Sequence, residues 1–431
     1  MSTRLFSYLI IWVAYLLFMR NFAPLGIDWL PWHEARIFNF IEYLNIHEYW
    51  NSYGFSIWNK CIDCNLSDDI STQIYLSKHS FSFSHLLLIN SLLGKDYFIF
   101  LGPLIDKAVI FFTAAACAEL FLLIIKDLIR IPLFYVGILT FSLFALNPWT
   151  YKMILSAWTE IYFLMFFLFA LIALIKERHN LGLLFLFLSG LYNYQWSFFV
   201  ASFIILISVF SYIVKEKPIK IFNFPDSTKP ALNFYKVIFS LLFPVLIFMT
   251  LKFLADSSIE GVSGSSVLYR IGITGSDIHN GGLLGSFQFL GGNRLSNCLN
   301  GPNFPFLSED LNMRISIYNC LLSLAGMFII SLISLGGFFH LLRKSNLSYI
   351  LLPLFFALVA MVFTLQQSLS VHLMGYSYIF SVFFSIGLAS NAVFAINNSQ
   401  SSVLRMVFSL PIFAGIIILC IHVSMLTGIN S

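Results

Sequence analysis

The residues best suited to chemistry near the start of the chain are Asp28, His33 and Glu34. They follow an apolar segment, Leu5–Met19, at the point where a membrane helix would leave the bilayer. Charged residues make up only 10% of the 431 residues, so two acids and a histidine at this edge need an explanation. A carboxylate partly removed from water gains proton affinity and becomes a better base. The segment therefore predicts Asp28 and Glu34 as catalytic residues at a membrane surface.

Structural roles are the alternative for the same two acids. Asp28 has the residue type of a helix N-cap, and Pro31 lies where the first turn of such a helix would be. Glu34 could be an ordinary solvated residue at the interface. Acids at membrane depth are often functional, which favours the catalytic interpretation.

The composition predicts a membrane protein. Hydrophobic residues make up 59% of the chain and the mean hydropathy is +0.85. A chain with so little polar surface needs lipid as its solvent. We predict an all-α polytopic membrane protein, with residues 1–431 as a single transmembrane domain and about eleven transmembrane helices. These spans are Leu5–Met19, Phe98–Ile125, Pro132–Leu146, Ala157–Ile175, Leu181–Leu191, Phe198–Val214, Val237–Leu254, Ile315–Leu342, Tyr349–Leu365, Val371–Ile396 and Val403–Met425.

Polar residues interrupt the fifth and sixth of these segments at Tyr192-Asn193-Tyr194-Gln195, which predicts two short spans with an external turn. One long buried helix is the alternative.

Two long polar loops, residues 21–97 and 255–314, are predicted to lie outside the cytoplasm. The first contains two candidate interfacial helices, Trp32–Leu44 and Phe81–Leu93, and the second of these ends before Gly94. Lysine and arginine gather in the short connections, which favours a cytoplasmic N-terminus and an external C-terminus. These basic connections are residues 126–130, 176–178, 215–236 and 343–344. Cys61 and Cys64 lie in the first of these loops and could form a local disulfide in an oxidising compartment.

Several stretches resemble the GT-C superfamily of membrane glycosyltransferases, such as the protein O-mannosyltransferases and the lipid A aminoarabinose transferase. The resemblance rests on one helix leading to an external loop that begins with acids, and on the stretches Ser84–Phe111, Leu146–Leu171 and Leu181–Phe203. It implies transfer of a sugar from a polyprenyl-phosphate or polyprenyl-diphosphate donor to an extracytoplasmic acceptor. The expected location is the bacterial inner (plasma) membrane.

Such a transfer needs a carboxylate for the acceptor hydroxyl and positive charge for the leaving phosphate. Asp28 and Glu34 suit the first task. Glu160 lies inside a predicted span, where an acid should face a cavity or a polar partner such as Lys152. The predicted substrate-binding residues are His33, Arg36, Lys152, Glu160, Arg294, His372 and Tyr376.

Each cationic candidate also has a structural alternative. Arg36 and Lys152 could extend their charge to the interface, and Arg294 follows glycines that mark an ordinary turn. His372 stands where the family often has an arginine, and it could be a packed histidine.

The expected partners are membrane lipids, the lipid-linked sugar donor and an acceptor, but no nucleic acid, because no long basic run occurs. No cofactor is expected beyond the donor substrate, and no acid cluster demands a metal ion. Two other functions stay open. A transporter or flippase of a lipid-linked sugar would use the intramembrane acids Glu119 and Glu160, and a non-catalytic assembly subunit would keep only the topology.

The predicted orientation can be tested by cysteine labelling. In a variant without the native cysteines, Asn280→Cys should react with a membrane-impermeant maleimide in intact cells, because residue 280 lies in the second external loop. Ser227→Cys, in the basic connection 215–236, should react only after permeabilisation. Labelling of Asn280→Cys that also requires permeabilisation would contradict this topology.

Overall fold

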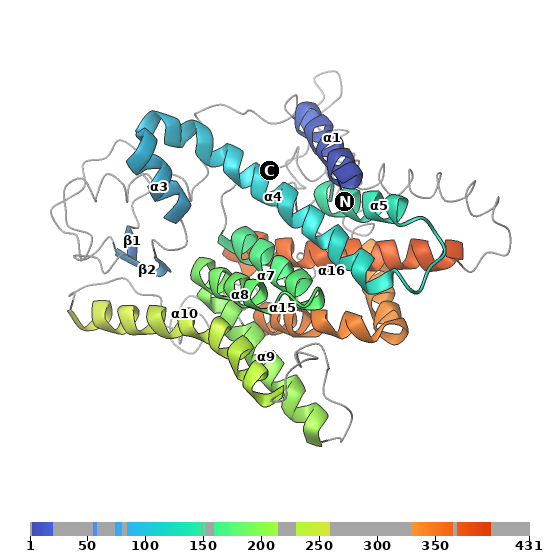
Figure 1. The fold of residues 1–431 in the computed structure, drawn as a ribbon. Helices are drawn as coiled ribbons and strands as arrows, with labels where there is room; N and C mark the ends of the chain where they lie inside the picture. Colours follow the sequence, from blue (N-terminus) through green and yellow to red (C-terminus); the bar gives the residue numbers. More distant parts are fainter. Residues whose placement is uncertain are drawn as a thin grey trace, which may run out of the picture. The chain divides into compact units, whose positions relative to one another are not determined.

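The structure is a computed structural model, and helices make up most of its described part (Figure 1). The described residues are 2–19, 55–57, 74–79, 84–147, 150, 159–213, 230–258, 329–364 and 369–397.

The apolar segments form helices wherever the structure describes them, as the sequence predicts. The principal helices are α1 (Ser2–Met19), α4 (Lys95–Ile125), α5 (Leu133–Ala145), α7 (Thr159–Ile175), α8 (His179–Tyr192), α9 (Tyr194–Ile213), α10 (Pro230–Ser258), residues 329–344, α15 (Leu352–Thr364) and α16 (Leu369–Asn397). The short helix α3 (Ser84–Leu93) ends before Gly94, whose φ of +89° is a conformation that glycine adopts without strain. The predicted helices at Trp32–Leu44 and Val403–Met425 lie outside the described residues.

Three of the described helices are long and apolar enough to cross a membrane. Their apolar parts are Leu104–Ile125, Phe234–Ala255 and Tyr378–Asn397. A helix of about 20 residues spans roughly 30 Å, the thickness of the hydrocarbon core. Other apolar helices are shorter, such as Leu133–Ala145 and Glu160–Ile175. The finding supports a membrane protein, and the number and direction of its spans stay predictions.

The chain divides into two compact units that interleave in the sequence. Unit 1 comprises residues 1–24, 110–153 and 277–431, and unit 2 comprises residues 25–109 and 154–276. The helix α4 contributes its first part, to Val109, to unit 2 and the rest to unit 1.

In unit 1, α5 packs against α1 and α16. The α1 face toward α5 carries Tyr8, Trp12 and Tyr15, which are all buried. Tyr8 stacks on Phe141 of α5 with ring centroids 4.6 Å apart, and aromatic pairs of this kind add to the packing energy. Phe6, Ile10 and Leu17 lie on the opposite side of α1 and are exposed, which suits a lipid-facing surface.

A close helix crossing joins residues 329–344 to α16 within unit 1. Gly337 lies so near the backbone of Gly387 that a Cβ atom would collide with its carbonyl oxygen. Beside it, Ser334 Oγ donates to the carbonyl oxygens of Phe383 at 3.0 Å and Phe384 at 2.9 Å. Small residues and hydrogen bonds between helices are the means by which apolar helices associate where lipid removes the hydrophobic driving force.

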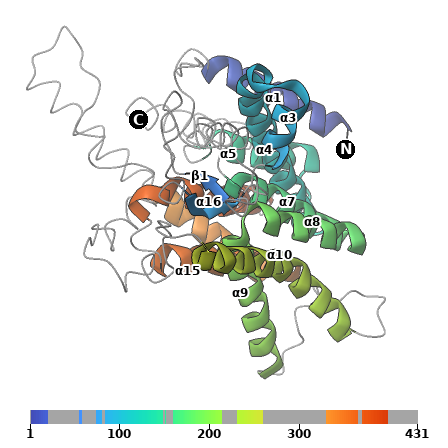
Figure 2. The ribbon, with the colours of Figure 1, turned by 90° about the vertical axis from the view of Figure 1, so that its left-hand side faces the viewer.

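In unit 2, α8 packs against α7 and α10, and α7 and α8 lie side by side in both views (Figures 1 and 2). Gly190 of α8 allows a close approach to Pro244 of α10. Asn193 separates α8 from α9 because its backbone is extended, with φ −149° and ψ 93°. The prediction of two helices here is confirmed, and the alternative of one long helix is wrong.

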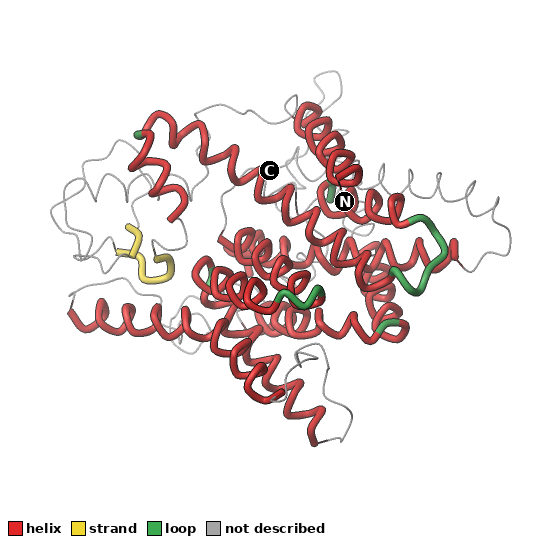
Figure 3. The backbone as a smooth tube through the Cα atoms, in the orientation of Figure 1, coloured by secondary structure: helices red, strands yellow, loops and turns green. Residues whose placement is uncertain are grey.

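A small antiparallel sheet is the feature that the all-α prediction did not include. Strand β1 (Phe55–Ile57) pairs with β2 (Ile74–His79), with Ile57 opposite Ile74 (Figure 3). Both strands lie in the first long polar loop.

Adjacent glycines allow a test of the close crossing. Gly337→Ala should lower the free energy of unfolding by about 1–3 kcal/mol, because the new methyl group meets the backbone of Gly387. Gly336→Ala is the matched control: its methyl group would enter open space, and alanine favours a helix over glycine by about 0.5–1 kcal/mol. Thermal unfolding in detergent, followed by tryptophan fluorescence, measures both. Equal stability of the two variants would contradict the crossing.

Candidate active site

Two carboxylates are buried in unit 2 near the beginnings of apolar helices. Asp106, about three turns into α4 and close to the start of its apolar part Leu104–Ile125, is 4% exposed, and Glu160, in the first turn of α7, is 9% exposed. Burial of an ionised carboxylate is costly unless hydrogen bonds compensate for the lost water. The structure supplies such bonds from Tyr162 and Asn193, and the ring of Tyr192 stacks on Tyr162. We call these five residues the acid cluster.

Tyr162 provides the partner of Asp106. Its hydroxyl group donates a hydrogen bond to Asp106 Oδ1 and so connects α7 to α4. The Tyr162 ring stacks on Tyr192 of α8, with centroids 4.8 Å apart and planes inclined by 8°. Tyr192 is in turn hydrogen-bonded to Ser84, at the start of α3. One carboxylate is therefore held by side chains that come from several helices.

Asn193 provides the partner of Glu160. Its Nδ2 donates to Glu160 Oε1 at 3.1 Å, and its Oδ1 accepts a hydrogen bond from the backbone N–H of Trp196 at 3.2 Å. The amide is thus fixed at both ends. This arrangement depends on the break between α8 and α9. The backbone is extended at Asn193, so α8 ends there, and the Asn193 side chain accepts a hydrogen bond from the first turn of α9.

Glu160 is the predicted site residue whose surroundings the structure describes. The expectation that this acid has a polar partner holds, and one partner is Asn193. For the other candidates the structure gives no side-chain description. Asp28, His33, Glu34, Arg36, Lys152 and Arg294 lie outside the described residues, and for His372 and Tyr376 only the backbone, in α16, is described.

Asp106, Tyr162 and Asn193 are not among the residues that the sequence predicts for a site. Asp106 was detectable as an acid inside a span, and Asn193 as a polar residue that interrupts one. Tyr162 gave no signal, because a tyrosine among the aromatic residues of an apolar helix is unremarkable in sequence. Only the packing of α7 against α4 gives its hydroxyl group a role.

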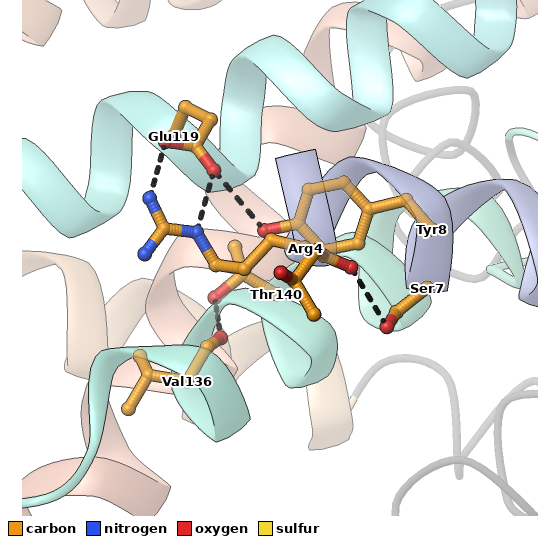
Figure 4. Close-up of polar contacts among 7 residues, drawn as sticks. Arg4, Ser7, Tyr8, Glu119, Val136 and Thr140 are labelled. Carbon is orange, nitrogen blue, oxygen red and sulfur yellow. Dashed lines mark hydrogen bonds and ion pairs between the residues drawn. The ribbon is translucent and has the colours of Figure 1, made fainter. Parts of the chain in front are cut away.

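A second polar contact, which is partly buried, lies in unit 1 and connects α1 to α4 (Figure 4). Arg4 Nε donates to Glu119 Oε1 at 3.0 Å, and Arg4 Nη2 donates to Glu119 Oε2 at 3.1 Å. Tyr8 adds a longer bond to Oε1 at 3.4 Å. The paired geometry suits a guanidinium and a carboxylate. Glu119 therefore has a charged partner, and its role is to hold the first helix in place.

The acid cluster is equipped to bind hydroxyl groups or to accept a proton. Its carboxylates are acceptors, and the phenol and amide groups fix their orientation. Among the described residues, no group of three or more His, Cys, Asp or Glu side chains could hold a metal ion.

The fold and the buried polar contacts define the chain as a helical protein with candidate membrane spans. No protein-family model matches it, and neither the curated proteins nor the solved structures gave a match.

The ion pair between α1 and α4 can be tested by a double-mutant cycle. Glu119→Gln and Arg4→Met should each lower the free energy of unfolding by about 1–3 kcal/mol, because each leaves a partly buried partner without its counter-charge. The double variant Arg4→Met/Glu119→Met should lose less than the sum. Asp127→Asn, at an exposed acid, serves as the control. Additive losses in thermal unfolding would contradict the pairing.

Proposed function

We propose that the protein is a membrane-embedded glycosyltransferase of the GT-C type, which moves a sugar from a polyprenyl-phosphate or polyprenyl-diphosphate donor to an extracytoplasmic acceptor. The observation that carries this proposal is the acid cluster, with its two buried and oriented carboxylates. The resemblance of the first half of the sequence to this superfamily gives the class of reaction.

The position of the acid cluster along the chain supports the proposal. The sequence predicts that α4 and α7 begin on the external side and that the break between α8 and α9 is an external turn. The structure brings these three places together in one unit through Asp106, Glu160 and Asn193. A polar site at the external ends of several helices is where an enzyme with a lipid-borne donor would meet its acceptor.

The proposed reaction breaks the bond between the anomeric carbon and the donor phosphate oxygen, and the phosphate leaves with the electron pair. The acceptor oxygen forms the new bond to the anomeric carbon, and its proton passes to a carboxylate. Asp28 or Glu34 is the proposed base. Asp106 and Glu160 are proposed to accept hydrogen bonds from sugar or acceptor hydroxyl groups, because they are already oriented by Tyr162 and Asn193.

The leaving phosphate needs positive charge or strong donors. We assign this task to the external cations predicted from the sequence and to a pair of residues on α16. They are Arg36, Lys152, Arg294, His372 and Tyr376, with His33 beside the catalytic acids.

A transporter of a lipid-linked sugar is the second candidate, and it rests on the intramembrane acids Glu119 and Glu160. Against this candidate we place the contact between Arg4 and Glu119, in which the carboxylate already has a counter-charge from a neighbouring helix. A non-catalytic subunit would keep the fold, but it has no need for two carboxylates buried at some energetic cost.

Transfer activity in detergent tests the proposal and separates it from transport, because a micelle has no two sides to move a lipid between. The purified protein, given the polyprenyl-linked sugars and acceptor extracted from its native membranes, should form glycosylated product detectable by mass spectrometry. Asp28→Asn should lower the rate by roughly 100-fold or more, as expected for loss of a general base. Glu160→Gln should also lower it while leaving the protein folded, since glutamine can still accept from Asn193.

Glu177→Gln is the control for these variants, because Glu177 is exposed at the turn between α7 and α8. It should leave the rate unchanged. Product formed by the Asp28→Asn variant at the normal rate would refute the assignment of the base. If the folded wild-type protein forms no product from the extracted donor and acceptor, the result would favour the transporter.

A further inference from the structure

Four exposed cations lie at one end of unit 1. Lys126 and Arg130 belong to the connection between α4 and α5, and Arg343 and Lys344 end the helix of residues 329–344. We call these four residues the basic end. None of them takes part in an ion pair among the described residues.

Hydrogen bonds bring these sequence-distant connections together. Ser345 Oγ donates to the carbonyl oxygen of Ile124 at 3.2 Å, which places the end of residues 329–344 beside the end of α4. The backbone N–H of Arg130 donates to Asn397 Oδ1 at 2.9 Å, which adds the end of α16. Three helices of unit 1 therefore end at the same place. Two of the four cations belong to the last turn of residues 329–344, and two belong to the connection after α4.

The local charge is strongly positive. Within residues 124–132, 340–348 and 394–397, Asp127 is the one acid, so four cations and one carboxylate leave a net charge of +3. Asp127 is itself exposed and makes no ion pair among the described residues. Such a concentration of one sign, without compensation by an ion pair among the described residues, attracts an external anion.

The neighbouring spans indicate which anion would be at hand. Two of the three described helices that are able to cross a membrane, Leu104–Ile125 and Tyr378–Asn397, end at the basic end. If these helices cross the bilayer, the side chains that follow them immediately lie at the depth of the lipid headgroups. At that depth the available anions are phosphate groups of lipids, and each nearby lysine or arginine adds to their attraction.

We propose that the basic end is a binding site for the headgroups of anionic phospholipids. Lipid phosphates bridge the α4–α5 connection and the end of residues 329–344, and they hold this end of unit 1 at the membrane surface. The site is independent of the proposed transfer reaction, because it uses none of the residues of the acid cluster.

The test measures energy transfer from tryptophan to dansyl-labelled lipids in titrations of the full chain in detergent at low ionic strength. Wild-type protein should bind dansyl-phosphatidylglycerol more tightly than dansyl-phosphatidylcholine, and added salt should reduce the difference. Lys126→Gln/Arg343→Gln should weaken the binding of phosphatidylglycerol roughly 25-fold, or roughly fivefold for each charge removed. It should leave the binding of phosphatidylcholine unchanged.

The pair Lys176→Gln/Arg178→Gln is the matched control, since it also removes two exposed charges, but from the turn between α7 and α8 in unit 2. It should change the affinity for phosphatidylglycerol by less than about twofold, because the proposal places lipid-specific attraction at the basic end alone. Equal losses for the two pairs would show a general charge effect and overturn the proposal. Equal affinity of wild-type protein for the two lipids would overturn it as well.

Two further arms keep the result interpretable. Lys126→Arg/Arg343→Lys keeps the charge and should keep the affinity, so loss of binding in this variant would refute a headgroup site based on charge. Inorganic phosphate at constant ionic strength should not displace the labelled lipid. Displacement by millimolar phosphate that depends on Lys126 and Arg343 would identify a site for a soluble anion and overturn the lipid assignment.

Discussion

The structure depends on one constraint: a charged or polar side chain inside an apolar helix must find its partner within the protein. Lipid offers no hydrogen bonds, and an unsatisfied polar group there costs several kcal/mol. Each described acid buried in an apolar helix meets this constraint through a different helix. Glu119 of α4 is held by Arg4 of α1, and Glu160 of α7 by Asn193 at the break between α8 and α9. The same bonds that satisfy these groups decide which helices are neighbours.

This constraint is important because the other forces between these helices do not select one neighbouring helix over another. Leucine and phenylalanine can pack against lipid about as well as against another helix, so apolar surface alone does not select a neighbour. Selection comes from hydrogen bonds and from places where backbones approach closely. The crossing at Gly337 and Gly387 combines both, since Ser334 donates to the opposite backbone next to the glycine contact. Polar contacts and small residues thus provide the specificity of a chain that is otherwise unusually apolar.

The sequence predicts the helices well because their signals are local. Runs of apolar residues mark them, and the polar stretch around Asn193 and the glycine at position 94 mark where they stop. The partners are not local. Arg4 and Glu119 are 115 positions apart, and no periodicity connects them. For Glu160 the sequence suggests Lys152, which lies outside the described residues and stays a prediction. The bond that the structure describes comes from Asn193, a residue that the sequence did not connect with Glu160. The sequence does not predict the strands β1 and β2, because they are short segments of a polar loop that has no repeating pattern.

The two acids of α4 show why burial alone does not define a function. Glu119 follows Asp106 by 13 residues in the same helix, a separation of roughly 20 Å along its axis. Asp106 is buried and Glu119 is partly buried, and their surroundings differ in chemistry. Glu119 faces a permanent cation, so its charge is neutralised and it serves to fix α1. Asp106 accepts a hydrogen bond from the phenol of Tyr162, which orients the carboxylate from a neighbouring helix. An oriented carboxylate oxygen is also a suitable acceptor for the hydroxyl group of a substrate. For this reason the proposed chemistry is assigned to the acid cluster, and not to the ion pair.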